Sequence, residues 1–107
     1  MKQTNQKTNQ AYLLFIALAA ALAIEGLDNI VVLSGGTDGT DGPTDAAGAI
    51  ADGNTVTQAR ENGLDPKDFL QRNDSYNFFQ KLDDLIMTGP TRTNVMDIYL
   101  LLVGRSN

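Results

Sequence analysis

The chain has 107 residues, no cysteine, no histidine and a net charge of −5. This length fits one small domain with a single core, since it would bury roughly 65% of the surface of the unfolded chain. The missing residue types exclude disulfides, thiolate chemistry, zinc sites of the Cys/His kind and histidine-based triads. Six acidic residues and no lysine or arginine lie between Lys7 and Arg60. Nucleic-acid binding, which depends on basic groups, is therefore not expected.

The N-terminal stretch permits two interpretations. Residues 1–26 combine a weakly basic start, an apolar run from Ala11 to Ile24 and small residues near the end, which is typical of a signal peptide. The run is shorter than the about 20 residues of a membrane span. The same run is rich in alanine and leucine, which favours a buried helix that Gly26 would end.

The following segment, "NIVVLSGG", predicts a buried strand. The β-branched run from Ile30 to Leu33 is typical of parallel sheets, and the glycines stop it. A helix, a buried strand and a glycine-rich loop in this order indicate an α/β protein, in which ligands bind beyond the carboxyl ends of strands. We therefore expect a small layered α/β domain with a mixed, mostly parallel sheet flanked by helices.

The middle of the chain predicts short helices. "DAAGAI" (45–50) favours a helical turn, and Thr55 resembles the N-cap of a helix that runs to Glu61 and ends at Asn62-Gly63. In the next helix Asp65 is the predicted cap, and Pro66 the first helical residue. "NDSYNFFQKLDD" (73–84) is a further helix with its aromatic residues in the core.

The last part of the chain predicts two strands. "LIMTGPTRTNV" (85–95) begins as a strand and continues as a loop of hydroxyl and amide side chains, and "DIYLLLV" (97–103) is a strand whose continuous apolar run suggests that both its faces are covered. Four further aromatic residues are expected in the core: Tyr12, Phe15, Phe69 and Tyr99.

The loop "SGGTDGTDGPTDAAG" (34–48) suggests three roles on its residues alone. Phosphate binding by a Walker motif needs a lysine after the glycines, and none is present. Asp38, Asp41 and Asp45 do not have the alternate spacing of a calcium loop, although one or two of these carboxylates are compatible with magnesium. Aspartate and glycine are also the ordinary residues of tight turns. The residues alone leave these roles open.

Three segments together resemble one known family. "SGGTDGTDGPTDAAGAIADG", "LQRNDSYNFF" and "TGPTRTNVMD" are similar to motifs of the MOFRL domain, and the likeness runs from about Asn9 to Val103. That domain is the C-terminal part of the glycerate 2-kinases, which are often labelled hydroxypyruvate reductases. The resemblance favours the helix over the signal peptide. It predicts one MOFRL-like domain over residues 1–107, with an N-terminal extension (1–8) and a tail (104–107).

The resemblance also implies an activity and a site. Family members are cytoplasmic two-domain enzymes that phosphorylate the 2-hydroxyl of D-glycerate with ATP and magnesium in the cleft between their domains. Asp38 and Asp41 are the magnesium candidates. The residues expected to line the cleft are Asn9, Gln10, Thr37, Asp38, Gly39, Asp41, Gly42, Asp45, Thr88, Gly89, Thr91, Arg92, Thr93 and Asn94.

Two departures from the family pattern bear on activity. The first helix of the family follows G-R-N-Q-E, whereas Thr8 stands here in place of the arginine and Ala11 in place of the acid. A hydroxyl carries no charge and does not replace a guanidinium that stabilises transferring charge. The N-terminal domain is also missing from these 107 residues. We therefore expect no turnover by the chain alone and assign no catalytic residue or cofactor to it.

A second hypothesis is a non-catalytic binding or assembly module. The surface that faces the N-terminal domain in longer relatives would be exposed here, and such apolar surface tends to be covered by a partner or a second copy. The predicted form is a homo-oligomer, most simply a dimer. The alternative partner is a missing N-terminal kinase domain. A small hydroxy acid is the candidate ligand, and neither nucleic acid nor membrane is expected as a partner.

Overall fold

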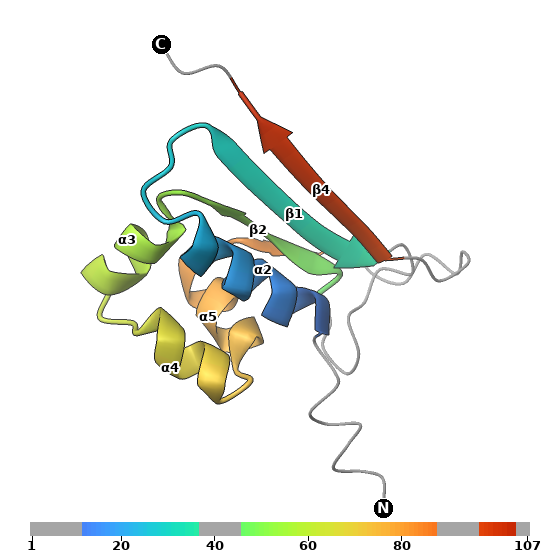
Figure 1. The fold of residues 1–107 in the computed structure, drawn as a ribbon. Coiled ribbons are helices and arrows are strands. Elements are labelled where there is room, and N and C mark those ends of the chain that lie inside the picture. The colour runs from blue at the N-terminus through green and yellow to red at the C-terminus, as the bar shows by residue number, and fades with distance from the viewer. Residues whose placement is uncertain (1–11, 37–45, 88–96, 105–107) are drawn as a thin grey trace, which may run out of the picture.

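The computed structural model describes residues 12–36, 46–87 and 97–104 (Figure 1). Predictions that fall on residues 1–11, 37–45, 88–96 and 105–107 lie outside these ranges. The described elements are α2 (Tyr12–Ala23), β1 (Ile30–Gly36), β2 (Gly48–Asp52), α3 (Thr55–Glu61), α4 (Pro66–Gln71), α5 (Ser75–Leu82), β3 (Leu85–Ile86) and β4 (Asp97–Val103).

The strands form one sheet in the order β3-β2-β1-β4, and every neighbouring pair is antiparallel. The α/β class is confirmed, but the expectation of a mostly parallel sheet is wrong. Only residues 37–47 join β1 to β2, whereas parallel neighbours need a crossover of about a dozen residues or more, usually with a helix. The apolar run of β1 was misleading because antiparallel strands with two apolar faces have the same sequence pattern.

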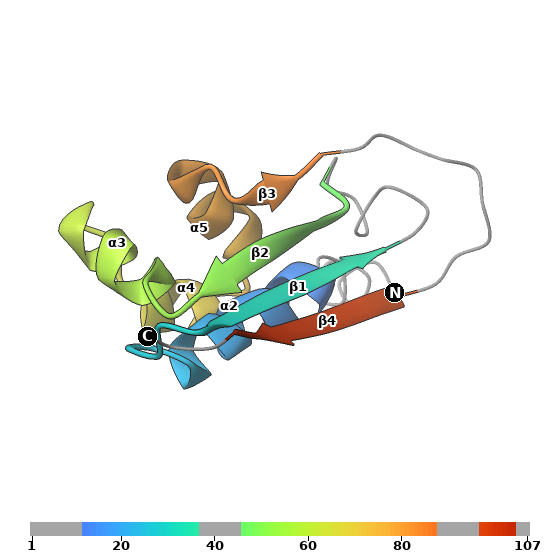
Figure 2. The ribbon, with the colours of Figure 1, turned by 90° about the horizontal axis from the view of Figure 1, so that it is seen from above.

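The described helices lie on one side of the sheet (Figures 1 and 2). Ala49 and Ala51 of β2 face them and are fully buried together with Leu14, Leu18 and Phe79. Small side chains at these sheet positions let α2 approach the sheet closely. The core therefore lies between the helices and one face of the sheet.

Helix α2 confirms the helical interpretation of the apolar run. Leu14 and Leu18 are fully buried, and the turn after the helix contains Gly26 at φ +87°, a conformation that glycine adopts without strain. Tyr12 and Phe15 are 54% and 36% exposed, so their assignment to the core is wrong. No helix in the described ranges is both long and apolar enough to cross a membrane.

Helices α3, α4 and α5 follow the local signals in the sequence. The Asp65 side chain caps α4 by accepting a hydrogen bond from the Lys67 amide (3.2 Å), and Pro66 is its first residue. The N-cap of α3 is Asn54, one residue before the predicted Thr55. The rings of Phe69 and Phe78 meet edge to face with centroids 5.6 Å apart, which confirms Phe69 as a core residue.

Within the segment predicted as a helical turn (45–50), the residues from Gly48 onward instead form the start of β2, and Asp45 lies outside the described ranges. Gly48 lies so close to β1 that a Cβ there would be 1.8 Å from the Ser34 carbonyl oxygen. This close pairing, which only glycine permits, decides the conformation in favour of the strand.

Strand β4 has the predicted position but not the predicted environment. Ile98 to Val103 are 43–62% exposed, so the expectation that both faces of the strand are covered is wrong for the described part of the chain. Tyr99, assigned to the core, is 51% exposed. A strand with the sequence of a buried one lies at the edge of the sheet.

Candidate functional site

The predicted site residues lie outside the described ranges. This holds for Asn9 and Gln10, for the residues of loop 37–45, including the magnesium candidates Asp38 and Asp41, and for Thr88 to Asn94. Their assignment to a ligand or a metal therefore stays a prediction. The described residues that adjoin them still have a definite geometry.

Those adjoining residues come together at one end of the sheet. In the strand register Gly36, which precedes Thr37, pairs with Asp97, the first residue of β4. Gly48 pairs with Gly35 on one side and with Ile86 on the other. The first turn of α2 lies at the same end (Figure 1). The chain thus enters or leaves each of the three predicted site segments at this end, which we call the loop end.

Short backbone contacts hold the loop end together. The Gly36 amide donates to the Ala47 carbonyl (2.9 Å), and the Ala47 amide donates to the Ile86 carbonyl (2.7 Å). Ala46, Ala47 and Gly48 are buried where the chain returns from loop 37–45. The strands that would carry a site here are therefore fixed relative to one another.

Ser34 is a feature of the loop end that sequence reasoning did not single out. Its hydroxyl is fully buried on the helix-facing side of β1 and has no hydrogen-bond partner in the described structure. A buried hydroxyl usually has a partner. The signal in the sequence was a polar residue in "LSGG", directly after the apolar run from Ile30 to Leu33 and within the same strand.

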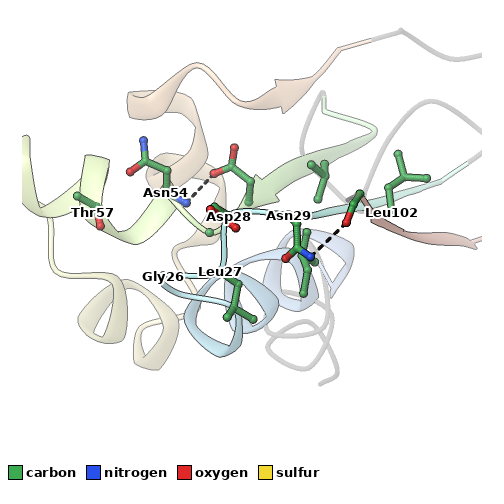
Figure 3. A pocket seen from close by; sticks show the side chains of 12 residues that line it. Gly26, Leu27, Asp28, Asn29, Asn54, Thr57 and Leu102 are labelled. Atoms are coloured by element: carbon green, nitrogen blue, oxygen red, sulfur yellow. Dashed lines mark hydrogen bonds between the residues drawn. The ribbon is translucent and has the colours of Figure 1, made fainter. Parts of the chain in front are cut away.

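A cavity of about 650 Å³ lies at the opposite end of the sheet (Figure 3). The Asn29 side-chain amide donates to the Gly104 carbonyl (3.2 Å) at its rim, and the Asn54 backbone amide donates to Asp52 Oδ1 (2.8 Å). Asp28 and Asp52 are its ionisable lining residues. The described residues that line the cavity include no lysine or arginine, so none of them offers a cation that would neutralise a phosphate group.

Acidic groups also influence one another beside this end. Partial burial raises the pKa of the Asp84 carboxyl, and the charges of Asp52 and Asp83 raise it further.

Within the described ranges, no group of three or more acidic, histidine or cysteine residues is arranged to hold a metal ion. The described structure therefore offers no metal site to compare with the predicted one.

The comparison with protein families decides the identity of the chain. The model described as MOFRL family matches residues 8–97. The chain belongs to the MOFRL family. The resemblance inferred from the three sequence motifs is confirmed.

Two relatives of this MOFRL chain are kinases by name. It is 51% identical over 88 residues to the D-glycerate 2-kinase of Thermotoga maritima, and 54% identical over 79 residues to the glycerate kinase of Danio rerio. These matches cover 82% and 71% of the chain but 21% and 16% of the relatives. The MOFRL chain thus spans about a fifth of the length of the curated relatives that it matches.

Solved structures give the same result for the fold. A crystal structure of glycerate kinase from Thermotoga maritima matches with a TM-score of 0.82 and 49% identity, over 85% of this chain and 22% of the other. A crystal structure of a Pyrococcus horikoshii protein also matches with a TM-score of 0.82 and 42% identity, over 88% of this chain and 21% of the other. The MOFRL fold described here therefore recurs within much longer chains.

Proposed function

We propose that this MOFRL chain supplies the C-terminal side of a D-glycerate 2-kinase active site and does not phosphorylate D-glycerate by itself. The observation that carries the proposal is the match to the Thermotoga maritima D-glycerate 2-kinase, which is 51% identical but confined to 21% of that enzyme. Identity at this level supports the same role for the matched region. The small share of that enzyme that the chain matches supports an active site that needs further polypeptide.

The proposed site lies at the loop end. Its candidate residues are Asn9-Gln10, the loop of Thr37 to Asp45 and the segment of Thr88 to Asn94. The convergence of Gly36, Gly48, Ile86 and Asp97 at this end supports their assembly, because these described residues adjoin the candidate segments. The cavity at the opposite end is a weaker candidate, since its described lining has two acidic residues and no lysine or arginine.

Electrostatics is the reason for expecting no turnover by the chain alone. A triphosphate beside Asp38, Asp41 and Asp45 would meet like charges, each worth about 1 kcal/mol at 4 Å even in water. Thr8 supplies no compensating charge where the family has an arginine. We therefore assign ATP and magnesium to the proposed complete enzyme, in which the other domain would contribute cations. Asp38 and Asp41 are the candidate ligands of the magnesium ion. A cytoplasmic location is proposed on the same family grounds.

A second candidate function is that of a binding module that pairs with a partner chain without catalysis. The specific observation in its favour is β4, whose aliphatic side chains are about half exposed although their sequence is that of a buried strand. Exposed apolar surface of this kind marks interaction sites. Under this hypothesis the covering of β4 by a partner is the function itself.

Complementation tests the proposed function. Thermotoga maritima D-glycerate 2-kinase, from which the region matching this chain has been removed, would be mixed with the purified chain and assayed for ADP formation from D-glycerate, ATP and magnesium. We expect no activity from either part alone and measurable activity from the mixture. Asp38→Asn should abolish the gain, whereas Asp68→Asn, on the exposed side of α4, should leave it unchanged.

The excised C-terminal region of the Thermotoga maritima enzyme is the positive control for that mixture. If it restores activity and this chain does not, the proposed kinase role is wrong and the binding-module hypothesis is favoured. Turnover by this chain alone would contradict the requirement for further polypeptide.

A further inference from the structure

The sheet has an apolar face that no described helix covers. Ala49 and Ala51 point towards the helices, and side chains alternate along a strand, so the residues between them point to the opposite side. The strand register extends this alternation to β1, β3 and β4. We call this side the open face; its aliphatic residues are Val31, Leu33, Ile50, Ile86, Ile98, Leu100 and Leu102.

The open face is exposed and almost uncharged. Val31, Ile50, Leu100 and Leu102 are 38–55% exposed, although each has the side chain of a core residue. By the same register, the ionisable residue on this face among the described strand residues is Asp52, at the last position of β2. The net charge of −5 therefore lies mostly elsewhere. Two such faces would meet without placing many like charges opposite one another.

The size of the open face agrees with a modest protein interface. With strands about 4.8 Å apart and a rise of about 3.4 Å per residue, the residues of β1, β2 and β4 together cover about 310 Å² before the relief of the side chains is added. A standard stable interface buries about 800 Å² per partner, and weak ones bury less. An interface of this size predicts association that is weak and dependent on concentration.

The shape and chemistry of the open face suit a second copy of the same chain. A sheet face packs well on another sheet face, with the strands about 30° apart and the backbones about 10 Å apart. A two-fold contact brings identical patches together, and an aliphatic face with little charge is complementary to itself. The cavity of about 650 Å³ borders this face only at one end of the sheet, at Val31, Asp52 and Leu102. The described strand residues of the face include no lysine or arginine that would call for an acidic partner.

We propose that two copies of this chain associate as a weak two-fold dimer through their open faces. The open faces form the centre of the dimer, and the helices of both copies lie outside. The contact buries Leu100 and Ile50 of each copy, and it does not require either copy to take part in kinase chemistry.

Sedimentation equilibrium of the full chain tests this proposal, over about 1 μM to about 1 mM, which brackets weak association. We expect the wild type to change from monomer to dimer within this range. Leu100→Glu places a charge on the open face and should weaken the dimer at least tenfold. Leu101→Glu is the matched control, because Leu101 is the next residue of β4, is also exposed and points to the other side. It should leave the dimer unchanged.

Nuclear magnetic resonance of the wild type provides a second measurement that needs no variant. Amide signals that shift with protein concentration should include Val31, Ile50 and Leu102, and those of α3 should not shift. The proposal is overturned if the chain stays a monomer, if Leu100→Glu leaves the dimer intact, or if Leu101→Glu abolishes it equally. It is also overturned if the open face binds only the truncated kinase.

Discussion

Gly48 is the residue whose replacement tests the packing of the loop end most sharply. In Gly48→Ala the new Cβ would lie 1.8 Å from the Ser34 carbonyl oxygen and 2.6 Å from the Gly35 Cα atom. Both are backbone atoms, so no side chain can rotate away. Relieving the clash requires β1 and β2 to separate by roughly 1.2 Å, which would stretch local hydrogen bonds of about 2.9 Å beyond their useful range.

The magnitude follows from the bonds that are lost. Two or three hydrogen bonds at about 0.5–1.5 kcal/mol each, with the packing beneath them, amount to a loss of about 2–4 kcal/mol in the free energy of unfolding. For a domain of this size, 3 kcal/mol lowers Tm by roughly 10–20 °C. Urea denaturation and thermal melts followed by circular dichroism would measure both quantities.

Gly35→Ala is the matched control on the paired strand. Its Cβ would meet the Ala47 carbonyl oxygen at 3.6 Å, which is ordinary contact. Alanine is also favoured over glycine within a strand, so this variant should be neutral or more stable by up to about 1 kcal/mol. Equal stability of the two variants would refute the close contact between β1 and β2 and, with it, the rigid geometry of the loop end.

Three further outcomes are expected. Phe78→Ala should lower the free energy of unfolding by about 3–5 kcal/mol, because the ring is fully buried against two other aromatic rings; a loss below 1 kcal/mol in urea melts would contradict this. Asp84→Asn should raise the free energy of unfolding at pH 7, because the site raises the pKa of the carboxyl and so disfavours its ionised form. The gain should vanish below the ordinary pKa of 3.8, where the carboxyl is protonated in both the folded and the unfolded chain. Melts that show a constant difference across pH would refute the assignment. Asp65→Ala should cost about 1 kcal/mol through loss of the cap of α4. Asn54→Ala should cost less, since the Asn54 side chain makes no capping bond, and a reversed order of the two losses would be inconsistent with the caps.

Local chemistry made much of the helical half predictable. Asp65 followed by Pro66 specifies the start of α4, and Asn62-Gly63 specifies the end of α3, because caps and turns depend on a few neighbouring residues. The direction of the strands was not predictable in this way. Parallel and antiparallel pairing both accept the run from Ile30 to Leu33. The direction depends on which strands become neighbours, and residues 37–47 join two strands that pair with each other directly.

The exposure of β4 was mispredicted for a related reason. Leu100 to Leu102 have the pattern of a strand that is covered on both faces. The pattern does not tell whether the covering residues belong to these 107 residues or to other polypeptide. For the candidate site, the sequence motifs identified the family, and the strand register adds the convergence of the adjoining residues at the loop end. The ligand contacts themselves stay predictions, since the residues that would make them lie outside the described ranges.

Calorimetric titration of ATP into the purified chain, in buffer that contains a chelator, tests the central claim most directly. A site rim with Asp38, Asp41 and Asp45, and with Thr8 in place of an arginine, should give no heat of binding up to about 1 mM nucleotide. Saturable binding with a Kd near 1 μM would contradict the claim that this chain needs cations from further polypeptide to hold a triphosphate.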